Sequence, residues 1–119
     1  MRGQMILGTG IDIIEIARIK KAVERWGDNF LAHVFNPEEI EYSRRHKNPY
    51  QHYAVRFAAK EAVFKAVGDL NMGWKDLTIT HDSDGKPICT YHLKGFANKI
   101  HISLSHSKDY AVANAIVTS

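Results

Sequence analysis

Residues 53–67 constrain the fold more than any other part of the sequence. They include no glycine or proline and many alanines, and Gly68 follows them directly. Alanine has the highest helix propensity, whereas glycine and proline have the lowest, so this composition predicts one long helix. Gly68 suits the left-handed conformation in which many helices end. We therefore expect a long helix against which the other elements of the domain pack.

Segments rich in β-branched residues predict an antiparallel sheet beside this helix. Turn-forming residues at 82–85 and 106–109 separate two pairs of these segments, as expected for hairpins. A sheet of this kind packed against a long helix is a compact α+β fold. The expected strands are residues 5–14, 77–81, 88–93, 101–105 and 110–117.

The remaining segments predict three further helices. Apolar residues recur with a helical period from Ile16 to Phe30, and basic residues lie between them. A second helix starts at Asn36, which is a good N-cap, and Glu39 can complete a capping box. This helix should end near residue 46, before Asn48-Pro49. Residues 95–99 are expected to form a short helix.

Length and composition predict a single domain over residues 1–119, because 45% of the residues are apolar and 24% are charged. The apolar runs are too short to cross a membrane, and the first residues lack the pattern of a signal peptide. Cys89 is the only cysteine, which excludes an intrachain disulfide. These features predict a cytoplasmic protein.

The charge and the motifs exclude several classes of protein. A net charge of +3 is too small for a nucleic-acid-binding tail, although basic residues cluster at 18–25 and 44–47. Such clusters suit an acidic partner or phosphate groups, and solvated helix faces have the same composition. The histidines lack the spacing of a zinc site, and no Walker-type loop is present.

Asp12 interrupts the otherwise apolar sequence GIDII at residues 10–14. A buried carboxylate is costly unless it is paired, hydrogen-bonded or bound to a metal. Asp12 could instead be the N-cap of the helix that follows, because aspartate is a favoured cap. Spacing alone favours the cap.

Two further polar clusters also have more than one interpretation. Glu61 and Lys65 are four residues apart and share one face of the long helix, and this spacing alone favours an ordinary exposed ion pair over a functional site. The sequence SLSHSK at residues 103–108 could bind phosphate through hydroxyls and turn amides. It could also be a serine-rich hairpin turn without a ligand.

In combination, these motifs resemble the holo-acyl-carrier-protein synthases. Residues 10–19 (GIDIIEIARI) are similar to the opening motif of that family, and residues 56–66 (RFAAKEAVFKA) to its helical signature. Residues 84–87 (DGKP) match its hairpin, and residues 103–111 (SLSHSKDYA) match its closing motif. The resemblance extends over residues 5–117. It implies the 4′-phosphopantetheinyl transferase fold and transfer of 4′-phosphopantetheine from coenzyme A to a carrier-protein serine, in fatty acid biosynthesis.

The resemblance also implies roles for individual residues. Asp12 and Glu61 would bind Mg²⁺, which prefers hard carboxylate oxygens, water and phosphate. Lys65 would stabilise charge on the same diphosphate during phosphoryl transfer. The base that accepts the serine proton could be a metal-bound water or Glu61, and the residues do not decide between them. The coenzyme would contact Arg56, Lys65, Gly85, Lys86, Pro87, Ser105 and His106.

Two kinds of protein partner are implied. The resemblance places Arg18 in recognition of the acidic acyl carrier protein, and spacing extends this stripe to Lys21 and Arg25. Members of this family form trimers with active sites shared between subunits, so a homotrimer is expected. No nucleic acid or membrane is expected as a partner.

The main alternative is a non-catalytic module that binds coenzyme A or a carrier protein. A general phosphate-binding protein that uses Arg56, Lys65 and the closing hairpin is a second alternative. Neither explains why Asp12, Glu61 and Lys65 occur together.

Overall fold

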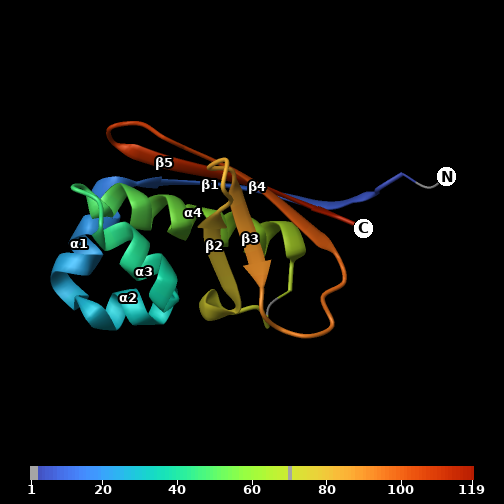
Figure 1. Cartoon of the computed structure of the whole chain (residues 1–119), viewed down its shortest axis with the longest axis horizontal. Coiled ribbons are helices and arrows are strands. Elements are labelled where there is room, and N and C mark those ends of the chain that lie inside the picture. The colour runs from blue at the N-terminus through green and yellow to red at the C-terminus, as the bar shows by residue number, and fades with distance from the viewer. Residues whose placement is uncertain (1–2, 70) are drawn as a thin grey trace.

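The computed structural model describes residues 3–69 and 71–119. The predicted α+β fold, an antiparallel sheet packed against one long helix, is confirmed (Figure 1). In the described residues, no helix combines the length and the apolar composition needed to cross a membrane. The helices are α1 (Ile16–Trp26), α2 (Asp28–Val34), α3 (Pro37–Arg44), α4 (Pro49–Val67) and the 3-10 helix η1 (Trp74–Asp76). The strands are β1 (Ile6–Glu15), β2 (Leu77–His81), β3 (Pro87–Tyr91), β4 (Lys99–His106) and β5 (Tyr110–Thr118).

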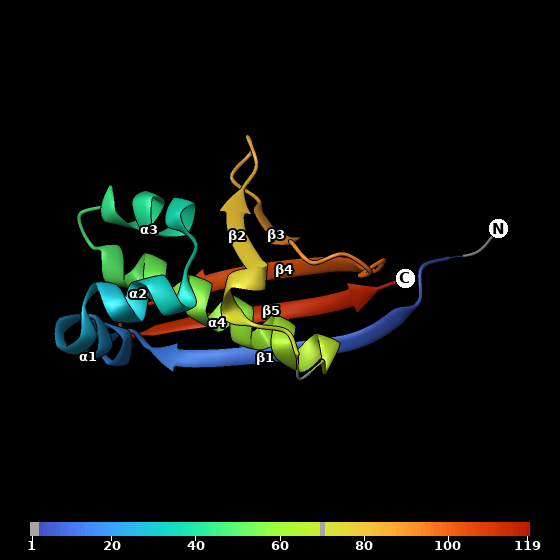
Figure 2. The same cartoon turned by 90° about the horizontal axis from the view of Figure 1, so that it is seen from below.

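The three long strands form one sheet, and the two short strands form a separate hairpin. The sheet has the order β1-β5-β4 and is antiparallel throughout, with Asp12 opposite Ala113 and Ser105 opposite Val112. Helix α4 runs along one face of this sheet, while α1, α2 and α3 gather at one end of the molecule (Figure 2). The start of β1 and the C-terminus lie at the other end (Figure 2).

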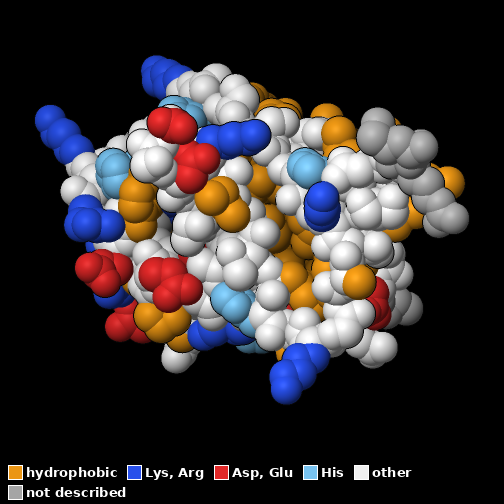
Figure 3. Space-filling view, turned by 45° about the vertical axis from the view of Figure 1, so that its right-hand side comes forward, with side chains coloured by type: hydrophobic (Ala, Val, Ile, Leu, Met, Phe, Trp, Pro, Cys, Tyr) orange, Lys and Arg blue, Asp and Glu red, His pale blue; other side chains and the backbone are white. Residues whose placement is uncertain are grey.

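Helix α4 and the sheet meet through very small side chains. Ala58 and Ala62 of α4 and Ala113 of β5 are fully buried. Gly10 of β1 approaches α4 so closely that a Cβ atom would lie 2.0 Å from the carbonyl oxygen of Ala62. No side chain fits at that distance, so β1 lies with its backbone against α4. Apolar side chains are also visible in a hollow near the centre of the face drawn in Figure 3.

Three of the predicted helices differ from the observed ones. The helix expected for residues 16–30 is divided, because Gly27 adopts a φ of 55° between α1 and α2. Helix α4 begins at Pro49, ahead of residue 53, since proline is well suited to the first helical turn. The short helix predicted for residues 95–99 is wrong. This segment is a turn in which Gly95 has a φ of 93°, which a right-handed helix does not allow.

The predicted start of α3 is confirmed, with an additional role for its N-cap. Glu39 Oε1 accepts the backbone N–H of Asn36 at 2.8 Å. The Asn36 side-chain amide donates to the carbonyl oxygens of Lys75 (3.2 Å) and Leu77 (3.0 Å) and to the hydroxyl of Thr78 (2.7 Å). Asn36 therefore attaches α3 to η1 and β2.

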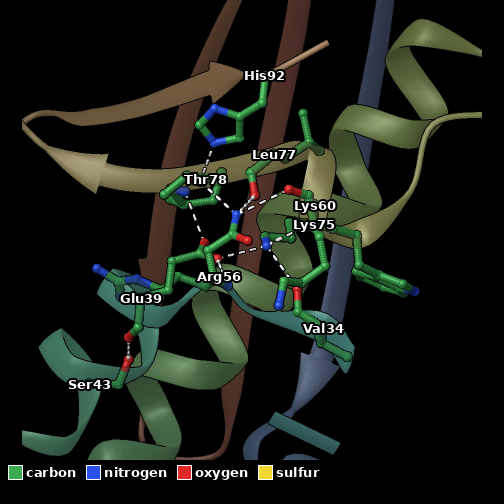
Figure 4. A network of polar contacts seen from close by, with 12 residues as sticks. Val34, Glu39, Ser43, Arg56, Lys60, Lys75, Leu77, Thr78 and His92 are labelled. Atoms are coloured by element: carbon green, nitrogen blue, oxygen red, sulfur yellow. Dashed lines mark hydrogen bonds and ion pairs between the residues drawn. The ribbon is translucent and has the colours of Figure 1, made fainter. Parts of the chain in front are cut away.

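A buried ion pair joins α3 to α4 (Figure 4). Lys60 Nζ lies 2.7 Å from Glu39 Oε1, and both side chains are completely buried. The Lys60 ammonium also donates to the carbonyl oxygens of Val34 (2.8 Å) and Trp74 (2.9 Å), so all three of its donors are used. Glu39 Oε2 accepts the backbone N–H of Ile79 at 2.9 Å. One lysine thus connects α4 to α2, α3 and η1, and its partner continues the network to β2.

The Lys60→Met variant is expected to lower the free energy of unfolding by about 3–5 kcal/mol, because Glu39 would remain as an uncompensated buried charge. Lys75→Met is a matched control. Lys75 also donates to a backbone carbonyl, that of Ala32 at 2.9 Å, but it is exposed, and the expected loss is below about 1 kcal/mol. Urea unfolding curves measure both values. Equal losses in the two variants would contradict a special role for the buried pair.

Candidate functional site

Asp12 lies in the middle of β1, at a position that alternates in phase with the buried residues Gly10 and Ile14. Its side chain is 17% exposed, and its Oδ1 lies 3.2 Å from Lys65 Nζ. Lys65 also donates to the carbonyl oxygen of Ile11 at 2.9 Å. The alternative that Asp12 caps the next helix is wrong, because Glu15 occupies the N-cap position of α1. Strand β1 therefore places the Asp12 carboxylate next to Lys65 of α4.

Glu61 of α4 is half-buried and interacts with the Asp12 charge. Burial raises the pKa of Glu61 most, the Asp12 carboxylate raises it further, and the Lys65 ammonium opposes both effects. The exposed Glu61–Lys65 pair that the spacing allowed is replaced by an ion pair between Lys65 and Asp12. The structure thus brings Asp12, Glu61 and Lys65 together where α4 crosses β1.

The two carboxylates fit a magnesium ion whose coordination is completed by a substrate. Mg²⁺ usually takes one or two carboxylates and obtains its other oxygens from water and substrate phosphates. Among the described residues, no group of three or more His, Cys, Asp or Glu side chains could enclose a metal. The repulsion between Asp12 and Glu61, seen in the raised pKa of Glu61, would be relieved by a bound cation.

A cavity of about 400 Å³ lies beside β4, near the β2–β3 turn and the N-terminal half of α4. This volume is typical of small-molecule sites, which range over roughly 300–1,000 Å³. Six of the seven residues predicted to contact a coenzyme therefore share one cavity. They are Arg56, Gly85, Lys86, Pro87, Ser105 and His106.

Arg56 is the most unusual residue of this cavity because its guanidinium is buried and forms no ion pair with a carboxylate of the described residues. The residue is 1% exposed, and the guanidinium lies 4.4 Å from the centre of the Tyr42 ring. Nη1 donates to the carbonyl oxygen of His52 at 3.2 Å, whereas the buried Nε has no hydrogen-bond partner within the described part of the chain. A buried positive charge with an unused donor is a binding position for an anion.

The sequence did not reveal that three histidines and a tyrosine surround Arg56. The Tyr42 ring lies 4.7 Å from the His46 ring and stacks on His81 at 5.4 Å, and His46 lies 3.8 Å from His52 between ring centroids. The histidines were expected to be surface or packing residues because they lack metal-site spacing. The available signal was that His52 is four residues before Arg56, and so shares its face of α4.

The predicted residues form two groups in one chain. Asp12 and Glu61 do not line the 400 Å³ cavity, and Lys65 lines a different hollow with residues of β1 and β5. Arg18, Lys21 and Arg25 are exposed on α1, outside both hollows. Of the seven predicted coenzyme-binding residues, Lys65 is therefore the one that does not line the 400 Å³ cavity of the same chain.

Comparisons with known proteins identify the family. The sequence model of the 4′-phosphopantetheinyl transferase superfamily matches residues 8–115. This chain belongs to that superfamily. A holo-[acyl-carrier-protein] synthase of Thermodesulfovibrio yellowstonii is 46% identical to this transferase over 115 residues, which cover 96% of this chain and all of the relative. A second such synthase, from Koribacter versatilis, is 40% identical over 123 residues, with coverage of 95% and 98%.

Solved structures agree with this assignment. The crystal structure of a Bacillus anthracis holo-(acyl-carrier-protein) synthase in complex with CoA (3′,5′-ADP) matches with a TM-score of 0.85 and 37% identity, covering 97% of this chain and 98% of that one. The Helicobacter pylori synthase in complex with coenzyme A matches with a TM-score of 0.82 and 30% identity, covering 92% and 98%. The chain is therefore a transferase of the holo-acyl-carrier-protein synthase type.

Proposed function

We propose that this transferase moves 4′-phosphopantetheine from coenzyme A to a serine of apo-acyl carrier protein, for fatty acid biosynthesis in the cytoplasm. The observation that carries the proposal is the grouping of Asp12, Glu61 and Lys65 where α4 crosses β1. A module that only bound coenzyme A or a carrier protein would not need two adjacent carboxylates and a lysine. The relatives named as synthases cover nearly the whole chain, which supports the same conclusion.

The cavity beside β4 is the proposed coenzyme site. An anionic ligand would pair directly with the buried Arg56 guanidinium, which forms no ion pair with any carboxylate in the described ranges. Lys86 and His106 line the same cavity and add positive or protonatable groups, and the Ser105 hydroxyl adds a donor. The turn at 85–87 would lie beside the nucleotide.

Asp12 and Glu61 are the proposed ligands of Mg²⁺. When bound, the cation would withdraw charge from the diphosphate and from the phosphate that leaves. The Lys65 ammonium lies 3.2 Å from the Asp12 carboxylate. Because the Lys65 side chain is 53% exposed, the ammonium can turn from Asp12 toward an incoming diphosphate. Lys65 would then stabilise the negative charge on the transferred group.

The proposed reaction forms one bond and breaks one. The serine Oγ of the carrier protein attacks the β-phosphorus of coenzyme A. The bond between that phosphorus and the oxygen bridging to the α-phosphate breaks, and adenosine 3′,5′-bisphosphate leaves with the oxygen. The serine proton passes to a base, which is either a water at the site or the Glu61 carboxylate.

Mass spectrometry of apo-acyl carrier protein tests the activity directly. Incubation with this protein, coenzyme A and magnesium is expected to add one phosphopantetheine group, and chelation of the metal should prevent it. Glu61→Gln retains the shape of the side chain but removes its charge, and should reduce the rate by at least about 100-fold. Glu41→Gln, an exposed site on α3, is the control and should leave the rate unchanged. Coenzyme binding without transfer to any carrier protein would favour the non-catalytic module instead.

A homotrimer with shared active sites is proposed as the functional assembly. Ile11 and Ile13 of β1 are 62% and 63% exposed on the sheet face that α4 leaves open. The cross-strand neighbour of Ile13 on β5 is Val112, which is half-buried, so the apolar surface extends to the next strand at this position. Exposed apolar surface of this kind is typical of subunit interfaces. The two separate groups of predicted residues could then combine across the interface.

Mixing two inactive variants tests the shared site. Glu61→Gln lacks a proposed metal ligand, whereas Arg56→Gln lacks the buried cation of the coenzyme cavity. If the two groups from neighbouring subunits form one site, mixed trimers contain some intact sites and should recover a measurable fraction of wild-type transfer. Sedimentation velocity should show the mass of three chains. A monomer at micromolar concentration, or no recovery after subunit exchange, would contradict the shared site.

Helix α1 is the proposed docking surface for the acidic carrier protein. Arg18, Lys21 and Arg25 are exposed along it, and the Arg25 guanidinium lies 4.8 Å from the centre of the Trp26 ring. Trp26 is 56% exposed, so the stripe combines positive charge with an aromatic surface. This combination favours an acidic protein partner.

Charge reversal tests this docking surface. Arg25→Glu is expected to raise the KM for the carrier protein by about fivefold or more at low salt, with little change in kcat or in the KM for coenzyme A. Lys94→Glu changes the net charge equally at an exposed position outside α1 and should have little effect. Carrier-protein kinetics at two salt concentrations provide the measurement. An unchanged KM for the carrier protein in Arg25→Glu would show that Arg25 does not contribute to docking.

A further inference from the structure

The histidine cluster around Arg56 has a hydrogen-bonding pattern that depends on protonation. His46 Nδ1 donates to the carbonyl oxygen of Tyr42 at 2.8 Å, which fixes the tautomer of that ring. Arg56 Nη2 lies 3.4 Å from His81 Nδ1. Because a guanidinium can only donate, Nδ1 of His81 must be an unprotonated acceptor whenever this contact exists. The contact therefore requires a neutral His81.

An anion bound at Arg56 would change this requirement. A phosphate oxygen that accepts from Nη2 replaces His81 Nδ1 as the acceptor of that donor. His81 can then take up a proton and donate to the same phosphate, because an imidazolium has two N–H donors and no acceptor. The exposure of His81 at the cavity leaves it open to solvent, from which the proton can come.

We propose that coenzyme A binds to this cavity together with one proton, which His81 takes up as a phosphate of the coenzyme replaces it as the acceptor of Arg56. The inference rests on the coenzyme site proposed above and adds a pH dependence to it. The proton comes from solvent and remains on His81 until the ligand dissociates. The chain thus gains an additional positive charge next to Arg56 only when an anion is present.

The charges around His81 favour the neutral ring before the ligand binds. Burial lowers the pKa of His81, the Arg56 guanidinium and His46 lower it further, and the Asp82 carboxylate opposes them. The neighbouring His52 is held neutral in the same way, with its pKa lowered to about 4 mainly by burial. The other groups that face this cluster are Tyr42 of α3, Lys86 of the hairpin turn and His106 of β4.

These shifts define the pH range of the effect. The free protein has a His81 pKa below 6.5, and an adjacent phosphate dianion raises it in the complex. Affinity for coenzyme A should therefore increase as the pH falls through the pKa of the complex, by up to about tenfold per pH unit for one proton. The increase should stop once the pH is below the pKa of the free protein.

Isothermal titration calorimetry of coenzyme A into the full chain tests this inference. Titrations at pH 7 in two buffers with different ionisation heats give the number of protons taken up. We expect an uptake of about 0.5–1 proton per site in the wild-type protein. His81→Gln should lose most of this uptake and flatten the dependence of the Kd on pH between 6 and 8. His33→Gln, at an exposed position on α2, should retain the wild-type values.

The outcomes separate this inference from the proposed function. Equal proton uptake in the wild-type protein and His81→Gln would show that the proton resides on the ligand or on another group, and would overturn the inference while the transferase activity stands. Failure of coenzyme A to bind at any pH would overturn both. Proton uptake that disappears in His81→Gln, with transfer to the carrier protein retained, would establish the linkage.

Discussion

The Lys60–Glu39 pair is the interaction on which the arrangement of this protein depends. Helices α2 and α3, η1 and β2 make few contacts with the three-stranded sheet. This pair and its hydrogen bonds connect them to α4, in addition to apolar packing in the shared core. A buried ion pair is costly to form. Once it has formed, a displacement of α3 relative to α4 is unfavourable, because it would leave a buried charge without its partner. Lys60 is adjacent to Glu61 in sequence. The network that holds α3 and β2 is therefore anchored one residue from a proposed metal ligand.

The two sides of α4 perform different tasks. On one side, alanines and the glycines of β1 allow the backbones to approach closely, and this approach carries Asp12 to Glu61 and Lys65. Elsewhere on the helix, Arg56 is buried in the wall of the cavity next to the β2–β3 turn. One rigid element thus positions both the charges suited to phosphoryl transfer and the cation suited to coenzyme binding. Arg56, Glu61 and Lys65 therefore fall within one short segment of sequence, because all three are positioned by this helix.

The sequence predicted most of the fold and nominated residues for the candidate site, but it did not predict how those residues are grouped. Helix α4, the strands and the α3 cap follow local rules of propensity, period and capping, so they could be recognised from short segments. The break at Gly27 and the turn at Gly95 depend on backbone conformations that glycine permits but does not require. The Asp12–Lys65 pair and the histidine cluster join residues distant in sequence, and no local pattern reports such contacts. The resemblance to a family assigned roles to these residues without showing that they lie in two places in the chain.

The glycine and alanine contact between β1 and α4 has a consequence for how the protein responds to heating. Because the separation of Asp12 and Glu61 is set by two backbones in direct contact, it does not depend on the rotamers of intervening side chains. Warming that loosens side chains elsewhere should leave this spacing unchanged until the helix leaves the sheet. The geometry of the proposed metal site should therefore be an all-or-none property of the folded chain, retained almost to the melting point and then lost in a single step with the fold.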